Sequence, residues 1–143
     1  MVRFWETSAL VPLVIEEPRS DACRRLFRIK AEVVVWALTR TEMVSAVWQR
    51  DRTSGLGDAA RAKALARVEA LAQGWCEIAD VEDVRERAER LLARHALRAA
   101  DALQLAAALT YWSDRPRGHD FVTADAALGR AAAVEGFQIL IQR

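Results

Sequence analysis

The chain opens with VRFWETSALVPLV (residues 2–14), a stretch that joins an apolar strand directly to a helix. Residues 2–5 are rich in β-branched and aromatic side chains, which favour a strand that ends at Glu6. Thr7 or Ser8 can cap a helix that continues to about residue 14, because their hydroxyls accept hydrogen bonds from free amide groups. A strand that leads straight into a helix is typical of α/β folds.

The same alternation of strand and helix continues to the end of the chain. Apolar runs predict further strands at 33–36, 75–79, 121–123 and 137–141. Apolar periodicity and capping residues predict helices at 20–30, 38–52, 58–72, 81–95, 99–112 and 126–134. This order predicts an α/β fold, a three-layer α/β/α sandwich around a central, mostly parallel sheet of four or five strands. Since no linker or repeat interrupts it, we expect residues 1–143 to form a single domain.

Composition narrows the class of protein. Hydrophobic residues make up 52% and charged residues 29% of the chain, which is enough for both a core and a solvated surface. No apolar run approaches the roughly 20 residues of a membrane span, and the N-terminus lacks the pattern of a signal peptide. Cys23 and Cys76 have no metal-ligand spacing. We therefore expect a cytoplasmic protein with reduced thiols and no membrane association.

Four acidic residues fall where an α/β sheet binds its ligands, beyond the carboxyl ends of its strands. Glu6 ends the first strand, and Glu42 lies one turn into the helix after the second. Asp101 is in the first turn of the alanine-rich helix, and Asp125 lies just past the strand at 121–123. Clustered carboxylates raise each other's pKa, and a hard cation such as Mg²⁺ or Mn²⁺ removes that penalty. The pattern predicts catalytic acids that hydrolyse a phosphodiester with a metal ion.

Each acid also has a purely structural explanation. Glu6 and Asp101 can be helix-start carboxylates that the helix dipole stabilises, and Asp125 can be the N-cap of the last helix. Glu42 lies among apolar neighbours on its helix, so it is expected to point inward, where a carboxylate needs a partner. Spacing alone leaves both explanations open.

Four short segments match the motifs of a known family in order and spacing. FWETSALV (4–11) is similar to an opening in which a strand leads into D-[TS]-S-A-L, and TEMVSA (41–46) is similar to E-x-x-S-A. RAADALQLA (98–106) is similar to D-A-L-x-L-A, and FVTAD (121–125) to a closing strand with T-x-D. Together they span nearly the whole chain and resemble the PIN-domain family, in particular its VapC-type toxins of type II toxin–antitoxin systems.

The resemblance implies a Mg²⁺-dependent endoribonuclease that acts on tRNA, rRNA or mRNA. It also implies a VapB-type antitoxin as partner, and a homodimer. Position in the motifs suggests Glu6, Asp101 and Asp125 as the metal contacts, directly or through water, with Glu42 completing the shell or orienting the attacking water. The hydroxyls that can position metal-bound water are those of Thr7 or Ser8 and of Thr123.

One departure from the family pattern leaves alternatives open. The first acid of the family is normally Asp, and here it is Glu6, whose carboxylate lies one methylene further from the backbone. Mg²⁺ demands near-ideal octahedral geometry, so this change can weaken the site. The first alternative is therefore a catalytically weakened PIN fold that binds RNA or an antitoxin without cutting. The second is a metal-dependent phosphatase or pyrophosphatase, although the chain has no glycine-rich phosphate loop.

Overall fold

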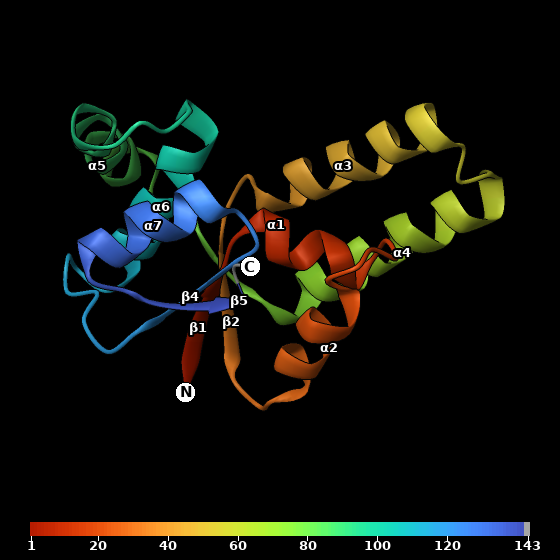
Figure 1. The fold of residues 1–143 in the computed structure, drawn as a ribbon, viewed down its shortest axis with the longest axis horizontal. Helices are drawn as coiled ribbons and strands as arrows, with labels where there is room; N and C mark the ends of the chain where they lie inside the picture. The colour runs from red at the N-terminus through yellow and green to blue at the C-terminus, as the bar shows by residue number, and fades with distance from the viewer. Residues whose placement is uncertain (142–143) are drawn as a thin grey trace.

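A central sheet of five parallel strands organises the molecule (Figure 1). The computed structural model describes residues 1–141. The strand order is β3-β2-β1-β4-β5, and every neighbouring pair is parallel, which confirms the expected α/β fold class. The strands are β1 (Val2–Trp5), β2 (Glu32–Trp36), β3 (Cys76–Ile78), β4 (Asp120–Thr123) and β5 (Gln138–Ile141).

Helices connect the strands and cover the sheet. They are α1 (Thr7–Leu10), the 3₁₀ turn η1 (Val11–Leu13), α2 (Ser20–Arg28), α3 (Thr39–Ser54), α4 (Asp58–Gly74), α5 (Val81–Arg94), α6 (Ala99–Tyr111) and α7 (Ala126–Glu135). Except for the first helix, the predicted bounds agree with these to within about two residues. Among the described residues, no helix has the length and hydrophobicity that a membrane crossing requires.

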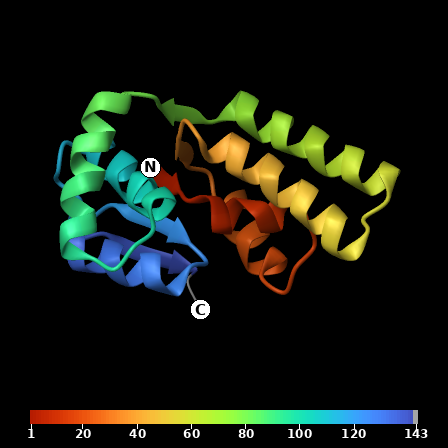
Figure 2. The same ribbon diagram turned by 90° about the horizontal axis from the view of Figure 1, so that it is seen from above.

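The two faces of the sheet belong to two separate apolar clusters. Phe4 and Phe121 stack on each other with ring centroids 5.4 Å apart and pack with helices α5, α6 and α7. Their strand neighbours Trp5 and Val122 point to the opposite face and pack with α1, η1, α3 and α4. This alternation follows from the two-residue period of a strand. Figures 1 and 2 show α3 and α4 side by side as a hairpin that extends away from the sheet.

The first helix is shorter than the sequence suggested. We expected it to continue to about residue 14, but the α-helix ends at Leu10 and a 3₁₀ turn follows at Val11–Leu13. Pro12 explains the change, because it lacks the N–H that an α-helix needs at this position and its ring crowds the preceding turn. The expected cap is also wrong: the N-cap is Glu6, whose side chain accepts a hydrogen bond from the amide of Ser8.

Candidate functional site

The central strands β1 and β4 end side by side and carry Glu6 and Asp125 just beyond their ends. Trp5 lies opposite Val122 in the strand register, and the amide of Glu6 donates to the carbonyl of Val122 at 2.9 Å. Asp125 follows the last residue of β4 by two positions. The chain therefore places both acids at the carboxyl edge of the sheet, as the sequence predicted.

Protein groups occupy both carboxylate oxygens of Glu6. The amide of Ser8 donates to Oε1 at 3.1 Å, while the hydroxyls of Ser8 and Thr123 donate to Oε2 at 2.5 and 2.7 Å. Burial raises the pKa of Glu6 to about 7, against the lowering effect of these hydrogen bonds, and the negative charge of Asp101 adds to the rise. Near neutral pH, Glu6 is thus divided between its protonated and its charged form.

The same two hydroxyls join the end of β1 to the loop after β4. Ser8 Oγ accepts from the amide of Ala124 at 2.8 Å, and Thr123 Oγ1 accepts from the amide of Asp125 at 3.0 Å. Asp125 caps α7 through Oδ1, which accepts from the amide of Leu128 at 2.9 Å. The hydroxyls thus contact protein groups here, and their predicted role in positioning water stays a prediction.

Glu42 is directed from α3 toward α1 and α6, as its inward position in the sequence predicted. Its Oε1 accepts hydrogen bonds from the hydroxyl of Thr7 at 2.6 Å and from the side-chain amide of Gln104 at 2.5 Å. Gln104 is a residue that the sequence analysis missed. The available signal was an amide side chain within an alanine-rich helix, three residues after Asp101 and so on the same side of α6.

Asp101 links the four acids electrostatically. It lies half-buried in the first turn of α6. Burial is the largest cause that raises its pKa, and the negative charges of Asp125 and Glu42 raise it further, while Arg98 lowers it. Since Asp101 also raises the pKa of Glu6, Asp101 lies within electrostatic range of each of the other three predicted acids.

This group has the chemistry of a site for a hard divalent cation. Its donors are carboxylate oxygens, and a cation would relieve the repulsion that raises the pKa of Asp101. Within residues 1–141, no three Asp, Glu, His or Cys side chains are close enough to hold a metal ion together. Mg²⁺ typically binds through one or two carboxylates and keeps several waters, so the donor set fits such a hydrated ion.

The all-parallel sheet with flanking helices and acidic residues at its carboxyl edge places the chain among the α/β proteins. Comparison with known families is more specific: the PIN domain family model matches residues 4–134, and the chain belongs to this family. A search of curated protein sequences found no match.

Solved structures with the same fold come from several organisms. PAE2754 from Pyrobaculum aerophilum is 20% identical, with a TM-score of 0.67 over 97% of this chain and 90% of that one. VapC20 from Mycobacterium tuberculosis, described as a sarcin–ricin-loop cleaving toxin, is 20% identical, with a TM-score of 0.64 over 90% and 93%. A toxin–antitoxin complex from Klebsiella pneumoniae is 14% identical, with a TM-score of 0.59 over 87% of each chain.

Proposed function

We propose that the chain is a VapC-like endoribonuclease toxin that hydrolyses phosphodiester bonds in RNA with Mg²⁺, or with Mn²⁺ in its place. The observation that carries the proposal is the electrostatic coupling of four carboxylates at the carboxyl edge of the sheet. Membership of the PIN-domain family supports it, and so does the fold shared with VapC20. A small-molecule phosphatase would not account for this combination of family and site.

The proposed roles follow from how free each carboxylate is. Asp101 is half-buried and Asp125 uses only Oδ1 for its cap, so both have oxygens available to bind the cation. Glu42 is held through Oε1 and orients the attacking water. The cation would activate that water and stabilise the charge that develops on the phosphodiester. Glu6 would supply negative charge in its ionised form and would contact the cation through water, because protein donors occupy both of its oxygens.

The same hydrogen bonds favour a second candidate, a PIN domain with weakened catalysis that binds RNA or antitoxin. In Glu6, the longer side chain places the carboxylate against Ser8 and Thr123 and away from solvent. If this burial disables the nuclease, Glu6→Asp will cut RNA faster than the wild type does. If burial is compatible with catalysis, Glu6→Asp will be no more active than the wild type, and Glu6→Ala will be less active than both.

Cleavage of total bacterial RNA tests the proposal. The purified protein is incubated with EDTA, Mg²⁺ or Mn²⁺, beside Asp101→Asn and the matched control Asp58→Asn. The side chain of Asp58 is 96% exposed at the start of α4, so its loss leaves the acidic group intact. We expect metal-dependent fragments from the wild type and the control, and none from Asp101→Asn. Equal cutting by all three proteins would contradict the assignment of Asp101.

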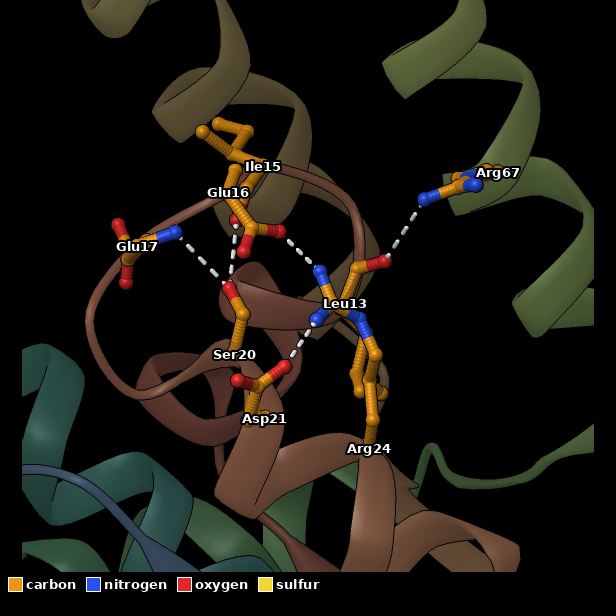
Figure 3. A network of polar contacts seen from close by, with 8 residues as sticks. All are labelled: Leu13, Ile15, Glu16, Glu17, Ser20, Asp21, Arg24 and Arg67. Atoms are coloured by element: carbon orange, nitrogen blue, oxygen red, sulfur yellow. Dashed lines mark hydrogen bonds and ion pairs between the residues drawn. The ribbon is translucent and has the colours of Figure 1, made fainter.

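We propose further that an antitoxin segment binds in the groove between α2 and α4. A hollow of about 330 Å³ there has an apolar lining that includes Leu13, Phe27 and Leu71, and its charged lining residues are Arg24, Arg28 and Arg67. Figure 3 shows one side of it, where Arg67 donates to the carbonyl of Leu13. An amphipathic helix with acidic flanks fits an apolar floor edged by Arg28 and Arg67.

The turn that leads into α2, which lines the groove, is fixed by local hydrogen bonds. Ser20 Oγ accepts from the amide of Glu17 at 2.9 Å and donates to the carbonyl of Ile15 at 3.2 Å (Figure 3). Arg24 forms ion pairs with Glu16 and Asp21, which secure the start of α2. These contacts give the groove a defined shape before any partner binds.

Growth rescue tests the groove. Co-expression with a candidate VapB-type antitoxin is expected to restore growth to cells that make the wild-type toxin. Leu71→Arg should remain toxic but escape rescue, because the charged side chain fills the apolar floor. Rescue of Leu71→Arg as efficient as that of the wild type would place the antitoxin elsewhere. We also propose that the toxin forms the homodimer that the family resemblance implies. Sedimentation of the purified toxin, alone and in complex with the antitoxin, would measure its oligomeric state.

A further inference from the structure

Gln104 lies where the helices that carry the acidic group meet. The residue is buried, with 1% of its surface exposed. From α6, its Nε2 reaches Glu42 Oε1 at 2.5 Å and Thr39 Oγ1 at 3.0 Å on α3, and Thr7 Oγ1 at 2.9 Å on α1. Asp101 lies one turn earlier on the same helix. One amide group therefore ties together three of the elements that build the site.

The hydrogens of this amide fix the orientation of Glu42. An NH₂ group has two hydrogens, so Glu42 Oε1 and the hydroxyls of Thr7 and Thr39 share these two donors. Thr7, which accepts from Gln104, donates its own hydrogen to Glu42 Oε1 at 2.6 Å. Both donors therefore meet on Oε1, and within the described part of the chain no hydrogen bond is made to Oε2.

The orientation of the amide is itself determined by Glu42. Gln104 Oε1 is buried and has no hydrogen-bond partner among the described residues. Rotating the amide by half a turn would place this oxygen 2.5 Å from a carboxylate oxygen of Glu42, which is repulsive. Leaving a buried carbonyl without a hydrogen bond is unfavourable. The hydrogen bond from Nε2 to Glu42 must therefore stabilise this orientation by more than the unpaired Oε1 destabilises it.

Such a contact solves an electrostatic problem of the site. Glu42 and Asp101 carry like charges in one acidic group, so a contact that holds Glu42 must not remove its charge. A lysine or arginine could hold Glu42 but would cancel the negative charge that attracts a cation. A neutral amide holds the carboxylate and leaves that charge in place.

We propose that Gln104 is a positioning residue, which holds Glu42 by Oε1 so that Oε2 is presented to a hydrated divalent cation. This inference rests on the proposed metal-dependent function and adds a residue to it. Groups that orient the ligands of a metal typically change metal affinity 10- to 100-fold when they are removed.

The contact itself is tested by NMR on the metal-free protein. The side-chain amide protons of Gln104 should exchange slowly with solvent, and one should be shifted downfield by the carboxylate. Glu42→Ala should move this signal toward that of a free glutamine, whereas Asp125→Ala should leave it in place. A Gln104 signal that does not respond to Glu42→Ala would overturn the inference, whether or not the protein is a nuclease.

Mn²⁺ titration tests what the contact does. Gln104→Met keeps the length of the side chain and removes its donors, and we expect Mn²⁺ to bind about 10- to 100-fold more weakly. The matched control is Thr39→Val, which removes another buried partner of Gln104 whose hydroxyl makes no hydrogen bond to the Glu42 side chain within residues 1–141. It should bind Mn²⁺ as the wild type does.

The outcomes separate the two proposals. The positioning role would be overturned if Gln104→Met bound Mn²⁺ as tightly as the wild type does. It would also be overturned if Gln104→Met and Thr39→Val weakened Mn²⁺ binding equally. Neither result would contradict the proposed nuclease function. A wild-type protein that binds no Mn²⁺ and cuts no RNA would refute the proposed function. It would also refute the cation part of the inference, and the NMR result would still decide whether Gln104 holds Glu42.

Discussion

Replacing Glu6 by glutamine should remove a pH-dependent loss of stability from the metal-free protein. Burial raises the pKa of Glu6 from 4.5 to about 7. The folded state therefore holds this proton more tightly than the unfolded state does. The stabilisation is fully present below about pH 4.5 and is lost as the pH rises through about 7. The difference in pKa corresponds to about 3 kcal/mol of unfolding free energy.

Glutamine resembles the protonated glutamate and does not ionise. Its carbonyl can accept from the amide of Ser8, and its NH₂ can donate to the hydroxyls of Ser8 and Thr123, which also accept hydrogen bonds from backbone amides. Relative to the wild type, Glu6→Gln should thus gain about 3 kcal/mol of stability as the pH is raised from about 4 to about 8.

Urea denaturation with EDTA at a series of pH values measures this difference. The control is Glu69→Gln, because Glu69 is exposed on α4 and forms no ion pair within residues 1–141, so its replacement leaves the buried group intact. The control should track the wild type across the series. If the stability difference between Glu6→Gln and the wild type did not change with pH, burial would not disfavour the ionised form of Glu6.

Three further predictions concern other parts of the chain. Gly136→Ala should destabilise the protein by about 1 kcal/mol or more in urea denaturation, because φ is +119° there and the added Cβ would lie 3.1 Å from Pro116 Cγ; unchanged stability would show that this helix end can shift. Arg87→Ala should cost about 0.5–1 kcal/mol, since Arg87 binds both oxygens of Asp114 at the surface. Because Arg87 lowers the pKa of Asp114, the loss of stability in Arg87→Ala should shrink as the pH falls below 3.8, the ordinary pKa of an aspartate. A loss that did not change with pH would contradict the pairing. Cys23 is fully buried with a pKa raised to about 11, so iodoacetamide should modify the exposed Cys76 first by mass spectrometry; the reverse order would contradict the burial.

The sequence predicted the fold well because strand and helix signals are local. β1 has the predicted bounds, and Asp125 caps α7, which is the structural role that the sequence allowed for it. The order of the elements then places the ends of β1 and β4 at the same edge of the sheet, so two of the four acids could be placed from topology.

What the sequence could not show depends on contacts between distant residues. Thr123 binds Glu6 across 117 positions, and Gln104 binds Glu42 across 62. A carboxylate at a strand end can point to solvent or turn inward, and the Glu6 carboxylate is held inward by the amide and hydroxyl of Ser8 and the hydroxyl of Thr123. The early end of α1 is a local effect of Pro12, which the predicted helix to about residue 14 left out of account.

The most direct test of the central claim is where a divalent cation binds. Crystals of the protein soaked in Mn²⁺ would reveal the ion by its anomalous scattering. We predict a peak between the carboxylates of Asp101 and Asp125, within reach of Glu42 through water, and no peak there in Asp101→Asn. A peak elsewhere, or none at this edge of the sheet at saturating Mn²⁺, would contradict the account.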